Sequence, residues 1–481
     1  MIAADFNVAR TKVDVISLDR LDDIDPVEEL SRRYGLPHLL DFLRSVKKTM
    51  EEPEEAFGRR YQRDAIRRPG LVLISPASGR QSLSTRSIAL EDKIFFRFCD
   101  DVDFYAVSSR VRFGYPLGGL FVPRENWILS WDRGRNRRLG PTQLRLLKTL
   151  LDRQHQPAPD RAAITPAIIM GHENFAHHMW NELSALERFL ADGPAYPVPE
   201  ILTTREPLGP LHAIFPEISG WKFARLNPDT RLGDNDPSKL YVNLGGYRIP
   251  SALKSRIVRY ATRSASPRLV VLMEQIRACG GPVFWLSVRI KAPTLVNQKE
   301  VVAVLCAQLM QRYRNCCIVL DGFSLPFDWK QTGPEMQQFY RSSADSSRKE
   351  IDALVAEITD RGQHVASQMI VNAGGFDILD SIALGQIADM YFCHSGTTQH
   401  KIAWTANLPG IIHCNSKTFA TDPAQWHAER LEGAIRPDVV PSALLADTDG
   451  GNKRGENYRA VDPAQLADFV MQKFGQYPRR R

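Results

Sequence analysis

Residues 171–189, GHENFAHHMWNELSALERF, combine three histidines with carboxylates at spacings that suit acid–base chemistry. His178 and Glu182 are four residues apart, and so are His177 and Asn181, which puts each pair on one side of a helix. A carboxylate beside an imidazole raises the pKa of the ring and fixes its tautomer. A histidine that acts as a general base or binds a substrate hydroxyl needs both effects. The alternative, in which these histidines only cap the helix or pack against neighbours, stays open. The predicted catalytic residues are His177, Glu182 and His172.

The spacing of the histidines argues against a zinc hydrolase. His172 and His177 are five residues apart, whereas the HExxH pattern places its two histidines four apart on one helix face. Five residues turn a helix by roughly 500°, which would leave the two side chains about 140° apart. The acidic stretches DDVD at 100–103 and DTDG at 447–450 are predicted to be exposed turns. We therefore predict no metal site.

A second polar cluster lies in YFCHSGTTQHKIAW, residues 391–404, where an apolar strand ends and a helix begins. Free backbone N–H groups at a helix start attract anions, and glycine lets a phosphate come close to the backbone. Hydroxyl groups in the turn can add donors, and a lysine in the first turns can add charge. An ordinary N-cap is the open alternative. The predicted anion-binding residues of this stretch are His394, Ser395, Gly396, Thr397, Thr398 and Lys401.

Three further residues follow predicted strands of the same region. Arg289 and Lys291 come after FWLSV, and Asp321 ends the run CCIVLD. Because the carboxyl ends of parallel strands meet at one edge of a sheet, the two cations are expected to face the same site as Gly396. Asp321 could accept from ribose hydroxyls there, or merely cap a turn.

The elements that position these residues alternate between strand and helix from about residue 160, which predicts an α/β fold with parallel sheets and covering helices. A long helical stretch at 250–280 is broken near Pro267, and a second alternating set begins at about 282. The predicted architecture is two Rossmann-like domains facing a cleft, with an N-terminal helical and β-containing extension. The predicted boundaries are 1–160 for the extension, 161–280 and 281–435 for the two α/β domains, and 436–481 for a C-terminal segment with a helix.

Local patterns add detail to this plan. Residues 1–68 are expected to be helical and charged, with a break at Gly35 and Pro37. Residues 70–131 are expected to form short β-strands, and residues 320–350 a long irregular loop.

Composition is that of a folded protein of two to three domains, with 43% hydrophobic residues among 481. No stretch has the roughly 20 apolar residues of a membrane span, and the N-terminus lacks the pattern of a secretory signal. The seven cysteines show no CxxC spacing and several lie in apolar runs, so we expect reduced core residues and a cytoplasmic protein. The net charge of +7, with arginine clusters near residue 60, at 132–138 and at the C-terminus, suits anionic partners.

The two polar stretches, in this order, resemble glycosyltransferases of the GT-B type, most closely family 61. The family segment N-[FY]-x-H-x-x-x-[DE]-[DE]-L is matched by Asn174, Phe175, His177, Glu182 and Leu183, with Asn181 where an acid is common. The later family pattern, a strand, an HG[AS]G-type turn and a PG before the next strand, is matched by the residues His394, Ser395, Gly396, Pro409 and Gly410. Here Thr-Thr-Gln replaces the usual second glycine and apolar residues. The resemblance covers roughly residues 70–415.

The resemblance implies an inverting, metal-independent enzyme that uses a nucleotide sugar as substrate and needs no cofactor. By position, His177 and Glu182 would lie on the acceptor side, in domain 161–280, and Arg289, Gly396 and Thr397 on the nucleotide-diphosphate side, in domain 281–435. The expected function is sugar transfer to a glycan, polysaccharide or lipid-linked acceptor, with the basic clusters holding the enzyme at the inner face of an anionic membrane. The alternatives are a non-catalytic transferase-like binding or scaffold protein and a nucleic-acid-binding protein. Nucleic acid is not the predicted partner, because the basic clusters are not interleaved with aromatic residues.

Overall fold

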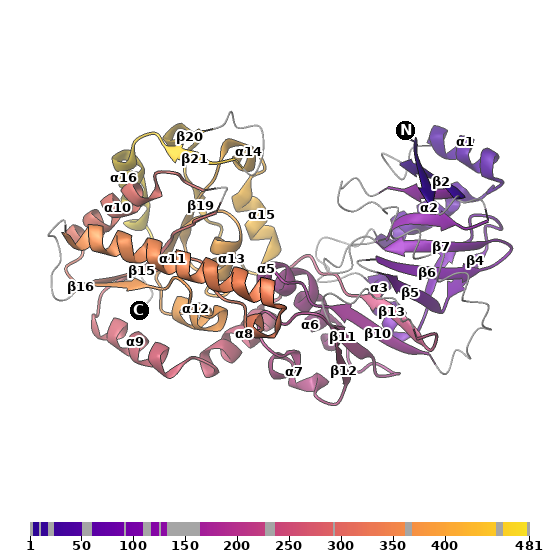
Figure 1. Ribbon diagram of the computed structural model, residues 1–481, viewed down its shortest axis with the longest axis horizontal. Helices are drawn as coiled ribbons and strands as arrows, with labels where there is room; N and C mark the ends of the chain where they lie inside the picture. Colours follow the sequence, from indigo (N-terminus) through magenta and orange to yellow (C-terminus); the bar gives the residue numbers. More distant parts are fainter. Residues whose placement is uncertain are drawn as a thin grey trace. The chain divides into compact units, whose positions relative to one another are not determined.

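The computed structural model describes residues 3–8, 11–17, 24–50, 60–90, 93–108, 117–124, 127–131, 164–226, 236–291, 294–360, 368–448 and 456–478 (Figure 1). The chain divides into two compact units. The first comprises residues 1–206 and 216–248, and the second comprises residues 207–215 and 249–481. The boundaries expected from the sequence, and the cleft between the α/β domains, stay predictions.

The first unit contains a seven-stranded sheet in the order β1-β2-β9-β8-β7-β6-β5. Its strands are β1 (Ala3–Val8), β2 (Thr11–Ser17), β5 (Arg86–Leu90), β6 (Lys93–Cys99), β7 (Asp103–Ser108), β8 (Leu117–Val122) and β9 (Trp127–Ser130). All neighbours are antiparallel except β2 and β9, which run parallel. The β-rich region expected at 70–131 is confirmed, and Asp101 lies exposed in the turn between β6 and β7, as predicted for DDVD.

The N-terminal expectation was wrong in part. Helices α1 (Ile24–Tyr34), α2 (Leu39–Met50) and α3 (Arg60–Arg67) are present, and the break between α1 and α2 falls at Gly35 and Pro37. Residues 3–8 and 11–17, however, are strands. In β2 the β-branched residues Thr11, Val13 and Val15 alternate with other residues, a pattern that favours a strand. A small hairpin of β3 (Leu71–Ile74) and β4 (Gln81–Ser84) follows the helices.

A second sheet of the first unit is parallel and has the order β12-β11-β10-β13. Its strands are β10 (Thr165–Met170), β11 (Glu200–Thr203), β12 (Lys222–Arg225) and β13 (Lys239–Asn243). Between β10 and β11 run α5 (Phe175–His177), the π-helix η3 (His178–Leu183) and α6 (Ser184–Ala191). In chain order the strands lie 3-2-1-4, which is part of the Rossmann arrangement.

The second unit is built on a six-stranded parallel sheet in the order β16-β15-β14-β17-β18-β19. Its strands are β14 (Val283–Ser287), β15 (Cys316–Asp321), β16 (Gln368–Asn372), β17 (Met390–His394), β18 (Gly410–His413) and β19 (Asp438–Val439). In chain order this is 3-2-1-4-5-6, the strand order of a complete Rossmann fold. The topological switch point, where ligands bind in such sheets, lies between β14 and β17.

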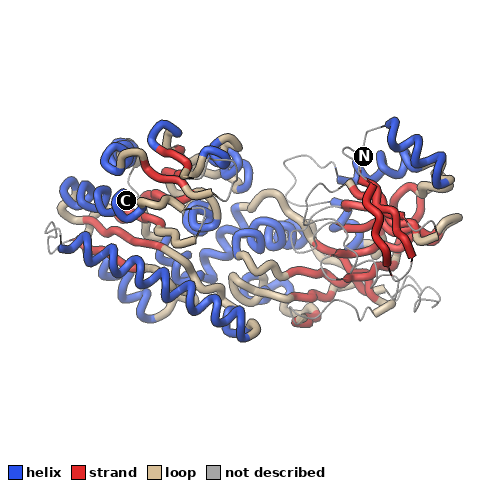
Figure 2. Tube along the Cα trace, turned by 45° about the horizontal axis from the view of Figure 1, so that its top comes forward, coloured by secondary structure: helices blue, strands red, loops and turns tan. Residues whose placement is uncertain are grey.

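Helices cover both faces of this sheet (Figure 2). The helices of the second unit are α7 (Leu211–Ile214), α8 (Ser251–Arg263), α9 (Pro267–Ala278), α10 (Gln298–Arg312), α11 (Pro334–Asp360), α12 (Ile378–Gly385), α13 (Thr397–Ala403), α14 (Ser416–Phe419), α15 (Pro423–Arg430) and α16 (Pro463–Phe474). Strand β14 shows how the two cores form: Phe284 and Leu286 pack with α10 and α16, whereas Val283 and Trp285 pack on the opposite face with α9 and α13. This alternation follows from the two-residue period of a strand buried on both sides.

Shorter elements complete the unit. A hairpin of β20 (Leu445–Asp447) and β21 (Tyr458–Ala460) precedes α16. The short helices are η4 (Pro216–Ile218) in the first unit and η5 (Trp329–Gln331) and η6 (Ser442–Leu444) in the second. The break expected near Pro267 is confirmed, because Pro267 starts α9 and the Ser266 hydroxyl caps it.

The irregular loop expected at 320–350 ends at residue 333, because α11 begins at Pro334. The buried face of the first half of α11 consists of Tyr340, Ser343, Ala344 and Ser347, which are one, three or four residues apart. Two of these four are serines, so the helical pattern is present but carries little hydrophobic signal.

The remaining expectations concern charge and cysteine. All seven cysteines are free thiols, and Cys99 is the exposed one. The arginine clusters at 132–138 and 479–481 lie outside the described residues. Near residue 60, Arg67 donates to the carbonyl groups of Phe189, Gly193 and Pro194, so part of that cluster closes the end of α6. Within the part of the chain that the structure describes, no helix has the length and hydropathy of a membrane span.

Candidate functional site

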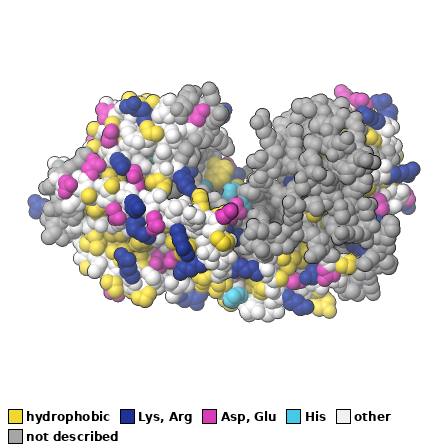
Figure 3. Space-filling view, in the orientation of Figure 1, with side chains coloured by type: hydrophobic (Ala, Val, Ile, Leu, Met, Phe, Trp, Pro, Cys, Tyr) yellow, Lys and Arg dark blue, Asp and Glu magenta, His cyan; other side chains and the backbone are white. Residues whose placement is uncertain are grey.

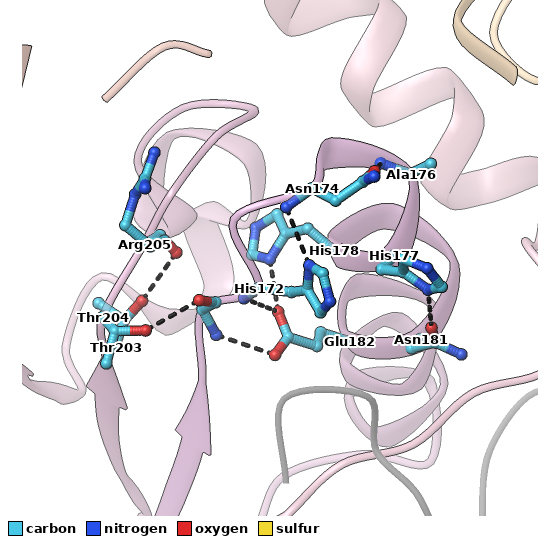
Figure 4. Close-up of polar contacts among 11 residues, drawn as sticks. His172, Asn174, Ala176, His177, His178, Asn181, Glu182, Thr203, Thr204 and Arg205 are labelled. Carbon is cyan, nitrogen blue, oxygen red and sulfur yellow. Dashed lines mark hydrogen bonds and ion pairs between the residues drawn. The ribbon is translucent and has the colours of Figure 1, made fainter. Parts of the chain in front are cut away.

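The histidine cluster of the first unit lies where β10 ends and α5 begins (Figure 4). Gly171 has a φ of 122°, and a Cβ at this position would lie 2.5 Å from the backbone nitrogen of Arg205. The Thr204 hydroxyl donates to the Gly171 carbonyl at 2.8 Å. Glycine is therefore needed here, because the end of β11 approaches the backbone too closely for any side chain.

Glu182 holds this junction in place. Its carboxylate accepts the backbone N–H groups of Gly171 at 2.9 Å and His172 at 3.0 Å, and it lies 2.6 Å from Nδ1 of His178 (Figure 4). Glu182 and His178 are both fully buried. The pair expected from the four-residue spacing is confirmed. We interpret Glu182 as a positioning residue, because its carboxylate is committed to backbone and His178 and no hydrogen bond links it to His177.

His177 makes the second expected pair, with Asn181. The Asn181 amide nitrogen donates to the Gly246 carbonyl at 3.1 Å, which turns the amide oxygen toward Nδ1 of His177, 3.0 Å away. An amide oxygen only accepts, so Nδ1 carries the proton and Nε2 of the neutral ring is the basic nitrogen. Burial lowers the pKa of His177 below its ordinary value, against the opposing effect of the Asn181 hydrogen bond. At neutral pH the ring is therefore in its base form.

His172 lies before the helix, which is capped by Asn174. The sequence interpretation placed His172 and His177 on one helix with their side chains about 140° apart. In the structure the two rings are adjacent, with centroids 4.7 Å apart. Nδ1 of His172 accepts the backbone N–H of Asn174 at 2.9 Å. Burial lowers the pKa of His172 to about 4. His172 is therefore a neutral ring packed beside His177, with one nitrogen committed to the backbone.

The helix after His177 has a π turn that sequence reasoning missed. Residues His178–Leu183 form η3, and the Trp180 indole donates to the Tyr247 carbonyl at 2.6 Å. Short π segments are frequent at functional sites. No residue type in this stretch marks the insertion, since its signal is a backbone hydrogen-bond pattern rather than a composition.

The second unit has a polar cluster at its topological switch point. Arg289 follows β14 and His394 ends β17, and Nη1 of Arg289 lies 3.0 Å from Nδ1 of His394. The guanidinium only donates, so Nδ1 of His394 accepts and Nε2 carries the proton. Burial, followed by the charge of Arg289, lowers the pKa of His394 well below its ordinary value. Among the described residues, buried Nε2 has no hydrogen-bond partner.

Arg289 is a partly buried cation held in a fixed position. Gln298 on α10 accepts the backbone N–H of Arg289 and donates to its carbonyl, at 2.9 and 2.6 Å. Burial lowers the pKa of the guanidinium, which nevertheless stays charged. Within the described ranges no carboxylate forms an ion pair with Arg289. A partly buried guanidinium with free donors has the chemistry to bind an anion.

The turn after β17 leaves room beside this cation. Gly396 has a φ of 122°, and a Cβ there would meet only Nη1 of Arg289, at 3.9 Å. Thr397 begins α13, and the first N–H groups of a helix have no partner within it. The Thr398 hydroxyl donates to the His394 carbonyl and the Ser395 backbone donates to the His413 carbonyl, so these two shape the turn.

Two residues expected in the anion site are engaged elsewhere, which corrects the sequence interpretation. Nζ of Lys401 donates to Asp321 at 2.5 Å, to the Gly322 carbonyl at 3.2 Å and to the Ser324 hydroxyl at 2.6 Å. These bonds use all three ammonium donors, and Lys401 and Asp321 are fully buried. Burial raises the pKa of Asp321 against the pull of Lys401. The pair supports the end of β15 and offers neither a free charge nor a ribose acceptor.

Lys291 keeps its place beside the site. Its carbonyl accepts from Nε of Arg289 at 2.9 Å, whereas its ammonium donates to Ser343 at 3.0 Å and lies 3.9 Å from the centroid of the Phe339 ring. The lysine therefore orients Arg289 through its backbone and directs its charge toward α11.

Two residues of the cluster were missed from the sequence. Nδ1 of His413 lies 2.7 Å from the Tyr458 hydroxyl, and the rings of His413 and Tyr458 lie 5.7 and 5.8 Å from that of His394. Burial lowers the pKa of His413 to about 3 and raises that of Tyr458. Both groups are neutral, so Arg289 supplies the positive charge of the cluster. His413 ends the strand GIIH, a signal that could have found it, but Tyr458 comes from a distant hairpin.

The chain is thus an α/β protein with two Rossmann-like parallel sheets, each carrying a polar cluster at the carboxyl ends of its strands. No protein-family model and no curated protein sequence matches it.

Solved structures that resemble the chain include a glycosyltransferase from Rickettsia africae, at 10% identity over 65% of this chain and 88% of that one, with a TM-score of 0.28. A family 9 glycosyl transferase from Veillonella parvula shares 10% identity over 61% of this chain and 67% of its own, at a TM-score of 0.22. A UDP-GlcNAc 2-epimerase from Methanocaldococcus jannaschii, in complex with UDP-GlcNAc and UDP, shares 9% identity over 72% and 82%, at a TM-score of 0.23. We assign the α/β fold with Rossmann-like sheets from the strand order, and not from these structural similarities.

Proposed function

We propose that the chain is a glycosyltransferase that moves a sugar from a nucleotide sugar to a glycan or polysaccharide acceptor, with inversion and without a metal. The observation that carries this proposal is Arg289, a fixed and partly buried cation at the switch point of a Rossmann sheet that has no carboxylate partner among the described residues. The resemblance of the two polar stretches to family 61 supports the same assignment.

The second unit provides what a departing diphosphate requires. The Arg289 guanidinium neutralises the charge that develops on the phosphate oxygens, and the open backbone at Gly396 adds donors beside it. His394 is neutral and accepts from Arg289 at Nδ1, so it orients the guanidinium without adding a second charge. Lys401 and Asp321 keep the neighbouring strand end in place.

The first unit provides the base. Nε2 of His177 takes the proton of the acceptor hydroxyl, the acceptor oxygen bonds to the anomeric carbon, and the bond from that carbon to the diphosphate breaks. The nucleoside diphosphate leaves with the electron pair of the broken bond. Asn181 keeps the basic nitrogen available for this step, and Glu182 holds the junction at Gly171 and His172 that precedes the helix of His177.

Nucleotide binding tests the proposed diphosphate site around Arg289. Titration calorimetry with UDP, GDP and CDP is expected to show binding of one of them, and Arg289→Ala is expected to weaken it about 10- to 100-fold, the loss of a charged hydrogen bond. Arg277→Ala, an exposed arginine of α9, is the matched control and should bind as the wild type does. Failure of every nucleotide to bind would favour a scaffold protein, and tight binding of RNA that falls steeply with salt would favour the nucleic-acid alternative.

Transfer tests the chemistry. With a donor found by the binding screen, His177→Ala is expected to lower kcat about 10²- to 10⁴-fold while nucleotide binding is unchanged. NMR of the product reports whether the anomeric configuration inverts, and activity after treatment with EDTA reports whether a divalent ion is needed. Retention of configuration or loss of activity in EDTA would refute the corresponding part of the proposal.

A further inference from the structure

The segment that follows Arg289 is bound to the hairpin β20–β21, which comes from near the end of the chain. Tyr458, the first residue of β21, donates its backbone N–H to the Thr294 carbonyl at 3.1 Å, and its carbonyl accepts the N–H of Val296 at 2.8 Å. Leu295 and Tyr458 are both buried, in the core that α10 and α16 share. A two-stranded hairpin is only marginally stable by itself, so these contacts keep β20–β21 in place.

Thr294 connects this hairpin to Arg289. Its backbone N–H donates to Oδ1 of Asn457 at 3.0 Å, and its hydroxyl donates to the Arg289 carbonyl at 2.8 Å. Both backbone groups of Thr294 are therefore bound to the hairpin, and its side chain is bound to Arg289. The Arg289 carbonyl accepts a second hydrogen bond from Gln298, so the hairpin and α10 together fix the backbone from which the guanidinium extends.

The same hairpin contacts the residues around the charged end of Arg289. The Tyr458 ring lies 5.8 Å from the ring of His394, and the Tyr458 hydroxyl lies 2.7 Å from Nδ1 of His413. His394 in turn accepts from Nη1 of Arg289. Tyr458 therefore holds the segment after Arg289 through its backbone and packs beside the histidine that orients the guanidinium through its ring.

The placement of this cation matters because the surface charge of the second unit is mixed. Basic and acidic side chains are interspersed among the described residues on the face that Figure 3 shows. A mixed surface attracts an anion only weakly, whereas a guanidinium that is held in place can form directed hydrogen bonds to phosphate oxygens. The affinity of the diphosphate site therefore depends on how firmly Arg289 is positioned.

We infer that Thr294 and Asn457 are positioning residues of the diphosphate site, and that the hairpin β20–β21 is part of this site. The inference rests on the proposed function. Thr294 acts by fixing the Arg289 carbonyl, and Asn457 acts by fixing Thr294, so neither has to touch the ligand. A cation that is already held loses less freedom when an anion binds, which increases affinity. If the two residues only stabilised the fold, replacing them would lower the melting temperature and leave anion binding unchanged.

Pyrophosphate binding to the full chain, measured by titration calorimetry, tests the inference. Thr294→Val replaces the hydroxyl by a methyl group of similar size, and it is expected to weaken binding about 3- to 10-fold, the usual contribution of one hydrogen bond. Asn457→Ala is expected to weaken binding by a similar factor. Thr294→Ser keeps the hydroxyl and should recover the affinity of the wild type. Arg459→Ala removes an exposed cation of β21 and is the matched control, with unchanged binding.

NMR of the Arg289 Nε–H tests the positioning without a ligand. This group donates to the Lys291 carbonyl at 2.9 Å. Its exchange with water is expected to be faster in Thr294→Val and Asn457→Ala than in the wild type, and to be unchanged in Thr294→Ser and Arg459→Ala. Circular dichroism and the melting temperature verify that each variant folds.

The outcomes separate the inference from the proposed function. If the wild type binds pyrophosphate and Thr294→Val and Asn457→Ala bind it equally well, the inference is wrong, even where the melting temperature falls. If the wild type does not bind pyrophosphate, the diphosphate site itself is refuted, and unchanged exchange of the Arg289 Nε–H in these two variants would refute the positioning as well. A loss of affinity in Thr294→Ser as large as in Thr294→Val would also overturn the inference, because serine retains the hydroxyl.

Discussion

Replacing Asn181 by aspartate tests whether this residue sets the state of the proposed base. The Asn181 oxygen lies 3.0 Å from Nδ1 of His177, so Asn181→Asp places a carboxylate in contact with the ring. A carboxylate at this distance typically raises the pKa of an imidazole by about 1–3 units, and the partial burial of His177 reduces solvent screening. We take about 2 units, which corresponds to about 2.7 kcal/mol in favour of the protonated ring.

A higher pKa of His177 lowers the fraction of the ring that is in the base form, and so lowers activity. In the wild type the pKa of His177 is lowered by burial, so the ring is neutral and basic at neutral pH. In Asn181→Asp the raised pKa moves the acid limb of kcat/KM about two units to higher pH, so activity falls on the acid side and returns about two units higher. The variant also loses the hydrogen bond to the Gly246 carbonyl, at a cost of about 1–3 kcal/mol in stability.

The assay is the pH dependence of kcat/KM, together with NMR of the ring nitrogens of His177, which reports tautomer and pKa without turnover. Asn181→Ala is the control: it removes the bond that raises the pKa of His177, so its acid limb should move to lower pH. If folded Asn181→Asp keeps the acid limb of the wild type, or if NMR places the proton on Nε2 in the wild type, the proposed role of Asn181 is wrong.

Three further predictions concern stability. Gly171→Ala should lower the free energy of unfolding in urea by about 3 kcal/mol, because its Cβ meets the neighbouring backbone and φ is 122°. A loss below about 1 kcal/mol would show that β11 shifts freely. Lys401→Met should lower the free energy of unfolding by about 3–5 kcal/mol, because it leaves Asp321 buried and unpaired. The double variant Lys401→Met/Asp321→Leu should recover much of this loss. No recovery would count against the pairing. The folded-state pKa values of His413 and His427, about 3 and about 4, lie below the ordinary value of about 6.5. The unfolded chain therefore binds these protons first, so the melting temperature should fall as the pH drops from about 6.5 toward 4, and a flat profile would contradict the burial of these rings.

Much of the fold could be predicted from periodicity. The strands of the six-stranded sheet are short apolar runs between turn residues, and the break at Pro267 follows from the missing N–H of proline. The interpretation failed in α11, where the pattern is weak because the buried stripe includes serines. It also failed in β1, which pairs with β2, and in β2, which pairs with β9 and whose alternating residues favour a strand. Neither failure concerned a residue that carries the proposed chemistry.

The sequence by itself determined which residues are available for chemistry: the spacing of four between His177 and Asn181 and between His178 and Glu182, and the glycine turn after β17. Only the tertiary structure decided their roles. It showed that Glu182 accepts backbone N–H groups, that Lys401 and Asp321 neutralise each other, and that Arg289 has a histidine rather than a carboxylate as its partner. The physical reason is that spacing along one helix or strand sets which side chains share a face, whereas the charge and proton of a buried group depend on partners that other segments of the chain bring to it.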